Sequence, residues 1–268
     1  MDEGLLERIE RYYDTVPRAA ARPEELPPLV LFVRQGAGWP YYARPLLGAR
    51  AFTAAGVRLV RERQRALGVP ERFEWIDEVT PGLGVAATEA GLVVTRHPLL
   101  VLGRHQPVEP PNGLTIRRAT AEDDLMLFSA VAQVGFRHPG TARGAAGVDE
   151  ARRIAVEPGA GRAQFEREQL RAGRTVMVIA LADGAPVGVG SHQPRDGVSE
   201  IVGVATLPAF RRRGIAAAIT SQLVRDALER GVQTVFLSAD DEEIARVYER
   251  VGFHPVATAC IAEPLEAS

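Results

Sequence analysis

The stretch SEIVGVATLPAFRRRGIAAAITSQL, Ser199–Leu223, decides how this chain folds. It predicts a strand that passes through a glycine-containing turn into a long helix, with three arginines at the junction. Ile215 and Ile219 keep a helical spacing of apolar residues, and Gly231 is a typical helix stop. We therefore expect a helix over 211–230. Backbone N–H groups at such a junction converge at a helix N-terminus, where they form a seat for phosphate or pyrophosphate.

Length and composition indicate a globular protein with one large or two ordinary domains. The chain has 268 residues, of which 46% are hydrophobic and 25% are charged. Its net charge of −2 gives no reason to expect nucleic acid or an anionic membrane as a partner. The N-terminus is acidic and amphipathic, unlike a signal peptide, and no apolar run is long enough to span a membrane. These features predict a cytoplasmic protein.

The residue types also exclude several kinds of chemistry. All 32 basic residues are arginines, a bias typical of a GC-rich bacterial genome, so no lysine can form a Schiff base or a P-loop. A P-loop nucleoside triphosphatase is thereby excluded. Cys260 is the single cysteine, and the five histidines lack ligand spacing, so we expect no metal site. His192 ends a predicted strand, where it either lines an acceptor pocket or is a satisfied structural histidine.

A proline-rich break divides the sequence into two halves. The segment QPVEPPNG, residues 106–113, carries three prolines and a glycine, and it predicts domains over 1–108 and 109–268. After the break, strands and helices alternate, which is typical of an α/β or α+β domain with a mixed sheet. The predicted strands cover 114–117, 176–182, 186–192, 200–206, 234–238 and 256–261, and the predicted helices cover 121–134, 163–172, 211–230 and 242–250.

The first half repeats part of this pattern. A predicted helix from Thr53 ends at Gly68 and is followed by a strand, a helix and a strand that closes after Gly91. In the second half, Gly231 and Gly252 stand at similar places. This spacing predicts a tandem duplication whose N-terminal copy is degenerate. The alternative is that the two passages are unrelated.

Residues 211–216, RRRGIA, match the pattern Q/R-x-x-G-x-G/A, and they follow a strand and open a helix. Residues 245–253, ARVYERVGF, end in a Gly-Phe pair after a short helix. Together these passages resemble the GNAT (GCN5-related) N-acetyltransferases over about 114–262. The resemblance implies a mixed, splayed central sheet flanked by helices, acetyl-CoA as co-substrate, and no metal. The N-terminal half resembles a degenerate copy without the motif.

The resemblance also implies roles for individual residues. Glu200 corresponds to a glutamate base, and Tyr248 to a tyrosine that protonates the leaving thiolate. Each has a plainer alternative, namely a strand-end carboxylate facing water and a helix residue packing its ring in the core. The family's cofactor-contacting Asn corresponds here to Asp241, which puts that contact in doubt. The implied cofactor-binding residues are a strand edge that pairs with pantetheine and a pyrophosphate cradle: Val204, Ala205 and Thr206, then Arg211, Arg212, Arg213, Gly214, Ile215 and Ala216. For the three arginines the alternative is a solvated helix start.

These expectations define an acetyl-CoA-dependent N-acetyltransferase in which an amine attacks the thioester directly. The acceptor is a small-molecule or peptide amine, set largely by the glycine-rich segment 136–161, which matches no substrate signature. Two alternatives stay open: a non-catalytic acyl-CoA-binding module acting as a sensor or interaction protein, and transfer to oxygen or of longer acyl chains. The sequence leaves the oligomeric state open, and a homodimer is compatible with it.

Overall fold

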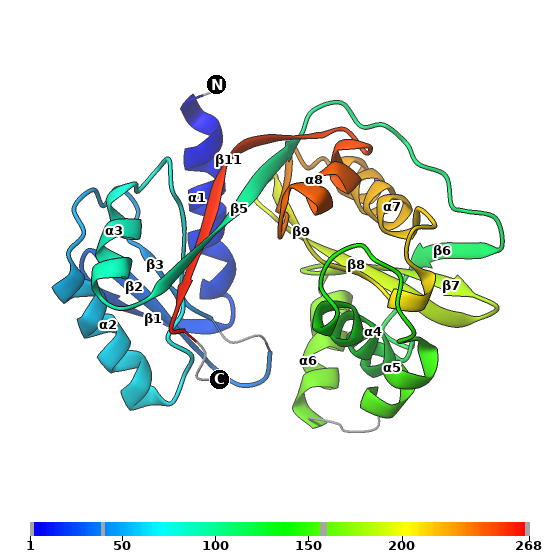
Figure 1. Ribbon diagram of the computed structural model, residues 1–268, viewed down its shortest axis with the longest axis horizontal. Coiled ribbons are helices and arrows are strands. Elements are labelled where there is room, and N and C mark those ends of the chain that lie inside the picture. Colours follow the sequence, from blue (N-terminus) through cyan, green and yellow to red (C-terminus); the bar gives the residue numbers. More distant parts are fainter. Residues whose placement is uncertain (1–2, 39–40, 156–159, 266–268) are drawn as a thin grey trace. The chain divides into compact units, whose positions relative to one another are not determined.

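The computed structural model describes residues 3–38, 41–155 and 160–265, and the chain divides into two compact units (Figure 1). Unit 1 consists of Met1–Leu99 and Val256–Ser268, and unit 2 of Leu100–Pro255. The expected division into 1–108 and 109–268 differs from these units at residues 100–108, which lie in unit 2, and at the end of the chain. Residues from Val256 onward lie in unit 1 because the last strand pairs there, with Cys260 opposite Trp75.

Both units contain helices and strands in alternation. Unit 1 contains α1 (Glu3–Arg18), β1 (Ala21–Leu26), β2 (Leu29–Arg34), β3 (Ala43–Pro45), α2 (Ala54–Leu67), β4 (Phe73–Ile76) and α3 (Gly82–Glu89). Two strands, β5 (Val93–Leu102) and β11 (Phe253–Glu263), run from one unit into the other. Unit 2 contains β6 (Leu114–Arg118), α4 (Leu125–Arg137), α5 (Val148–Ala155), α6 (Ala160–Arg171), β7 (Val176–Ala182), β8 (Ala185–Arg195), β9 (Val198–Thr206), a 3₁₀ turn η1 (Pro208–Phe210), α7 (Ile215–Glu229), β10 (Thr234–Ser238) and α8 (Glu242–Glu249).

The two units repeat one strand order, which confirms the expected duplication. Unit 1 has the order β1-β2-β3-β4-β11, and unit 2 has β7-β8-β9-β10-β5, with β6 beyond β7. In each unit the first two pairings are antiparallel and the third, β3 with β4 or β9 with β10, is parallel. The mixed α+β architecture predicted from the sequence is therefore present. None of the helices in the described residues is long and apolar enough to cross a membrane.

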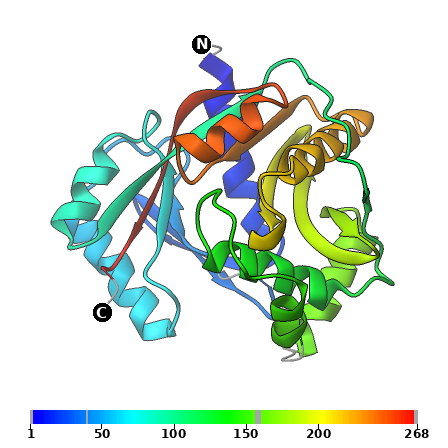
Figure 2. The same ribbon diagram turned by 45° about the vertical axis from the view of Figure 1, so that its right-hand side comes forward.

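Helices cover both faces of the unit 2 sheet, with α7 on one side and α4 and α5 on the other (Figures 1 and 2). The alternation of side chains along β7 explains this arrangement, because successive residues of a strand point to opposite faces. Val178 and Ala180 pack in the cluster that contains α7, whereas Ile179 packs in the cluster of α4 and α5. The strand buried on both faces reads as the continuous apolar run VMVIALA.

The helix predicted over 211–230 begins four residues later, at Ile215. Arg212 and Gly214 have φ values of +62° and +80°, which no right-handed helix accommodates. Pro208 opens η1 just before this turn. The structure also contains α5 within the segment 136–161, where the sequence predicted only a glycine-rich connection; residues 156–159 of that segment lie outside the described residues.

Glycines on β8 allow α7 to lie close to the sheet. A Cβ atom added to Gly188 would stand 2.9 Å from Cγ2 of Ile215 and 3.2 Å from the carbonyl oxygen of Ala205. Gly190 is equally confined, since its Cβ would stand 2.9 Å from Cγ2 of Ile219. The first turns of α7 are therefore held in place through contacts that only glycine permits.

We expect Gly188→Ala to destabilise the protein by about 1–3 kcal/mol, because the new methyl group overpacks against Ile215 and the backbone of Ala205. Urea unfolding followed by circular dichroism measures the change. Gly56→Ala is the matched control: its Cβ would meet atoms at 3.5 Å and 3.9 Å, ordinary contacts, and alanine favours the helix α2. Equal effects of the two substitutions would contradict the close packing of α7 on β8.

Candidate functional site

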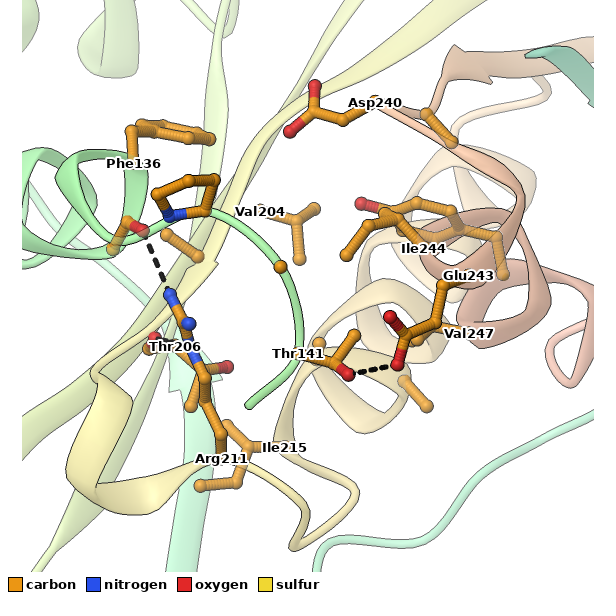
Figure 3. A pocket seen from close by; sticks show the side chains of 18 of the residues that line it. Phe136, Thr141, Val204, Thr206, Arg211, Ile215, Asp240, Glu243, Ile244 and Val247 are labelled. Carbon is orange, nitrogen blue, oxygen red and sulfur yellow. Dashed lines mark hydrogen bonds between the residues drawn. The ribbon is translucent and has the colours of Figure 1, made fainter. Parts of the chain in front are cut away.

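An open pocket of about 660 Å³ lies in unit 2, between the splayed strands β9 and β10 (Figure 3). It is lined by β9, the turn before α7, the first residues of α7, one face of α8 and the segment that follows α4. The sequence-predicted residues that line it are Glu200, Val204, Ala205, Thr206, Arg211, Arg212, Gly214, Ile215, Ala216 and Tyr248. The fold thus brings together residues that are up to 48 positions apart in the sequence.

The second half of β9 borders the pocket because its pairing with β10 stops early. The paired positions run from Val198 with Thr234 to Glu200 with Phe236. On the other side, the register with β8 shifts between Val189 and Ser191, and Gly203 in β9 has a φ of +66°. These features are typical of a β-bulge, which bends a strand and redirects its backbone groups. The bulged strand runs along the pocket from Glu200 to Thr206.

The N-terminus of α7 supplies hydrogen-bond donors at one end of the pocket. Its N-cap residue is Gly214, which has no side chain with which to satisfy the first N–H groups of the helix. Ile215, Ala216 and Ala217 form the first turn, which carries no acidic side chain, and all three line the pocket. The positive end of the helix dipole and these N–H groups favour an anion at this place.

The N-terminus of α2, at the corresponding place in unit 1, is different. Its N-cap is Thr53, and the Thr53 side chain accepts a hydrogen bond from the N–H of Gly56 at 3.2 Å. This helix therefore satisfies one of its own terminal donors. The two copies therefore differ at this helix start: the first N–H groups of α7 have no side-chain cap, whereas Thr53 caps α2. This difference is one structural form of the degeneracy expected for the N-terminal copy.

The three arginines of the turn have different surroundings. Arg211 donates from Nε to the carbonyl of Thr206 at 3.3 Å and from Nη2 to the carbonyl of Gly135 at 2.9 Å. It also donates to the carbonyls of His138 and Ala142. Burial lowers the pKa of Arg211, which nonetheless stays charged. In this structure the Arg211 guanidinium thus joins the end of β9, the end of α4 and the segment after α4 through hydrogen bonds to their carbonyls.

Arg212 and Arg213 make contacts that differ from those of Arg211. Arg212 lines the pocket, and its Nη1 lies 3.9 Å from Oε1 of Glu243 on α8. The guanidinium carbon of Arg213 lies 5.8 Å from the centre of the Phe210 ring, in cation–π geometry. Within the described residues, Arg213 is not among those that line the pocket. Only two of the three predicted arginines therefore border it.

A segment that we call the strap, residues 138–147, follows α4 and borders the pocket through His138, Pro139, Gly140 and Thr141. Backbone hydrogen bonds fix it to η1, from the N–H of Gly144 to the carbonyl of Pro208 at 3.2 Å and from the N–H of Ala209 to the carbonyl of Ala146 at 3.0 Å. The hydroxyl of Thr141 donates to Oε1 of Glu243. Figure 3 shows these two side chains pointing toward one another.

The candidate base and acid both border the pocket but differ in burial. Glu200 is half-buried near the start of the bordering stretch of β9. Tyr248 on α8 is buried, with its ring edge-on to Phe253 at 6.4 Å between centres. Burial, and then the charge of Asp240, raise the pKa of Tyr248 well above its ordinary value, so the phenol stays protonated. A protonated hydroxyl can donate a proton or a hydrogen bond.

His192 belongs to a buried network outside the pocket lining. Its Nδ1 lies 2.9 Å from Oγ of Ser199, and its Nε2 lies 3.0 Å from Oδ1 of Asp226. Arg118 and Arg230 complete the set by pairing with the same aspartate. All polar atoms of the imidazole are satisfied, and burial lowers its pKa. His192 is therefore the structural histidine of the two sequence alternatives.

Sequence reasoning assigned the segment 136–161 to the acceptor but gave no individual role to Phe136, Thr141 or Glu243. All three line the pocket: Phe136, with 55% of its surface exposed, at the end of α4, Thr141 in the strap and Glu243 in α8. An exposed aromatic residue ending an apolar helix was the available signal for Phe136. Asp241, which the sequence resemblance pairs with a cofactor-contacting Asn, caps α8 by accepting from the N–H of Ile244 at 2.8 Å.

Comparison with known proteins now places the chain. Residues 147–253, within unit 2, match the sequence model described as the acetyltransferase (GNAT) family. A GCN5-related N-acetyltransferase from Kribbella flavida is 25% identical, with a TM-score of 0.72, covering 98% of this chain and 96% of that one. A GCN5-related N-acetyltransferase from Sphaerobacter thermophilus is 19% identical, with a TM-score of 0.58, covering 97% and 87%. No curated protein matches the chain.

A further similar structure is described as a tandem GNAT protein from the clavulanic acid biosynthesis pathway. It is 16% identical with a TM-score of 0.56, covering 90% of this chain and 79% of that one. This similarity supports the duplicated fold alone. Residues 147–253 match the GNAT acetyltransferase family, and nearly the whole chain, including the N-terminal half, aligns with structures of that family. The fold and family predicted from RRRGIA and ARVYERVGF are thereby confirmed.

Proposed function

We propose that the protein is an acetyl-CoA-dependent N-acetyltransferase whose active site is the pocket of unit 2. One observation carries the proposal: the Gly214-capped N-terminus of α7 and the bulged stretch of β9 border the same pocket. The first offers donors for a pyrophosphate, and the second offers a strand edge for the amides of pantetheine. A ligand that carries both a pyrophosphate and an extended pantetheine chain would use both features, whereas a compact phosphate would use only the helix N-terminus.

The pocket residues take separate roles in binding. The N–H groups of Ile215 and Ala216 hold the pyrophosphate, and Gly214 lets its oxygens approach the backbone. Arg212 adds a charge-assisted contact. Arg211 has an indirect role, since it keeps the β9 end, the strap and the C-terminus of α4 in one arrangement. Val204, Ala205 and Thr206 present the edge for pantetheine.

The chemistry divides between Glu200 and Tyr248. Acetyl-CoA supplies an activated acetyl thioester when bound. An alkylamine is protonated at neutral pH, with a pKa of about 10.4, so it needs a base before it can attack the carbonyl carbon. Glu200 takes that proton, directly or through water. Tyr248 keeps its proton at neutral pH and gives it to the sulfur as the carbon–sulfur bond breaks.

The decisive experiment measures thiol release from acetyl-CoA by the full chain across a library of small amines and N-terminal peptides. We expect amine-dependent release with at least one acceptor class. Cofactor binding without release by any amine would favour the alternative of an acyl-CoA-binding module. Absence of cofactor binding would refute the proposal. Testing acetyl-CoA against longer acyl-CoA thioesters in the same assay decides the acyl chain length.

We expect Ala216→Glu to weaken acetyl-CoA binding by at least about 100-fold, since a carboxylate at the phosphate seat repels the pyrophosphate and fills its space. Isothermal titration calorimetry measures the dissociation constant. Glu is a good helix former, and an acidic residue in the first turn of α7 favours the helix dipole, so the fold persists. Gln222→Glu, further along the same helix and not among the described pocket residues, is the control. Equal dissociation constants for both variants would show that the pyrophosphate does not bind at the first turn of α7.

A further inference from the structure

Three side chains from three parts of unit 2 meet beside the phosphate seat. Thr141 comes from the strap, Arg212 from the turn before α7, and Glu243 from the first turn of α8. The Thr141 hydroxyl donates to the Glu243 carboxylate. Nη1 of Arg212 lies 3.5 Å from Oγ1 of Thr141 and 3.9 Å from Oε1 of Glu243. The carboxylate is thus the anion toward which both donors point.

These contacts are suited to opening and closing. The side chains of Arg212 and Glu243 are 66% and 54% exposed. Ion pairs with such exposure are weak and exchange readily, because water screens both partners. The buried Arg44–Glu10 pair of unit 1, with exposures of 3% and 7%, shows the contrast.

The strap is joined to the turn before α7 by several hydrogen bonds and to α8 by Thr141. Arg211 binds the carbonyls of His138 and Ala142, and Nε of Arg143 donates to the carbonyl of Arg211 at 3.1 Å. Those contacts join the strap to the turn. Thr141 joins it instead to α8, across the pocket from β9 (Figure 3). Breaking the Thr141–Glu243 bond would release residues 139–141 of the strap, between the anchored residues His138 and Ala142.

We propose that Glu243 is an internal anion that latches the strap across the pocket and is displaced when a phosphate-bearing ligand binds. This inference rests on the proposed acyl-CoA site. The pyrophosphate takes over Arg212, the Glu243 carboxylate turns away, and Thr141 is released. Because the latch opens and closes readily, the ligand binds only the open fraction of the molecules, and the association rate is reduced by the fraction that is latched.

The test uses the full chain with a fluorescent coenzyme A analogue as the probe, and it measures association rates by stopped-flow fluorescence. The analogue carries the signal because Trp75 lies in unit 1, away from the pocket residues of unit 2. Glu243→Gln and Thr141→Val should each raise the association rate by about threefold to tenfold, which corresponds to loss of a weak polar contact. Glu249→Gln, on the same helix and exposed, is the control and should change the rate by less than about twofold.

Thr141→Val separates the latch from a simple charge effect. Glu243→Gln removes a negative charge and therefore favours binding of any anion, whether or not the strap moves. Thr141→Val leaves every charge in place and removes only the hydrogen bond. An effect of Glu243→Gln without one of Thr141→Val would overturn the proposal. Hydrogen exchange of ligand-free strap amides is a second readout, and it should be faster in both variants than in the Glu249→Gln control. Unchanged exchange would also overturn it.

The outcomes also distinguish failure of this inference from failure of the proposed function. If no variant binds coenzyme A, the acyl-CoA site is refuted, and hydrogen exchange still shows whether the Thr141–Glu243 bond restrains the strap. If all variants bind with equal rates, the acyl-CoA site stands and the latch is refuted. The association rate should also be measured at several salt concentrations. The difference between the original protein and Glu243→Gln should shrink as ionic strength rises, because salt screens the competition of two anions for Arg212.

Discussion

Replacing Gly252 by alanine is expected to destabilise unit 2 by about 3–5 kcal/mol, a larger loss than we expect from Gly188→Ala. Gly252 follows α8 and has a φ of +104°. A Cβ atom there would stand 2.0 Å from the carbonyl oxygen of Arg104. The neighbour is backbone, so no side-chain rotation relieves the overlap. The hydrogen bond from the N–H of Gly103 to the carbonyl of Gly252, at 3.0 Å, would be lost as well.

Thermal and urea unfolding measure this change, and Gly231→Ala is its matched control. Gly231 ends α7 with a φ of +76°, but nothing lies within 4 Å of a Cβ added there. The control therefore reports the cost of the left-handed backbone alone, about 1 kcal/mol. If both substitutions lower stability equally, the close approach of residues 104 and 252 is not a real constraint on the fold.

Tyr248→Phe is expected to lower kcat by about 100-fold while leaving the KM for acetyl-CoA within about threefold of the original value. The substitution keeps the ring that packs edge-on to Phe253 and removes only the hydroxyl. Without a proton donor, the departing sulfur must leave as a thiolate. Steady-state kinetics with the acceptor found by the amine screen measure both constants. This prediction depends on the acetyltransferase proposal.

The pH profile gives a second check on Tyr248. Because burial raises its pKa above the ordinary value of 10.0, the hydroxyl is protonated over the whole range below pH 10. Loss of its proton therefore contributes no fall in kcat on the alkaline side up to that pH. Tyr12→Phe, at a buried tyrosine of α1, controls for loss of a buried hydroxyl and should leave kcat unchanged. Full activity of the Tyr248→Phe enzyme would exclude Tyr248 as the acid.

Local patterns predicted the regular elements well. The apolar runs of β7 and β10 were bounded correctly at 176–182 and 234–238, since each is a short buried strand between clear stops. The helix bounded by Thr53 and Gly68 was equally clear, because its cap and its stop are both local signals. Helix α4 begins later than predicted, at Leu125, because the Asp124 side chain accepts from the N–H of Leu127 and so sets the N-cap there.

The candidate site was predictable where one segment carries it. The Gly214 turn and the β9 edge lie within the quoted stretch, so the pattern of that stretch alone predicts the anion seat that we propose. What could not be predicted depends on contacts between distant segments. Arg211 looked like a phosphate ligand, yet its donors meet carbonyls about 70 positions earlier in the chain. Sequence reasoning gave no role to Glu243, which is an acidic residue in the first turn of α8. No spacing rule links it to Thr141.

The strand order has a consequence for how the chain can be divided. In each unit the strand beside β4 or β10 comes from the other half: β11 lies next to β4, and β5 lies next to β10. The two copies have exchanged their closing strands within one polypeptide, as the partners of a domain-swapped dimer do between two. A protein cut near residue 108 would yield two fragments, each with its closing strand in the other fragment. Neither fragment would contain the complete strand order of its own unit.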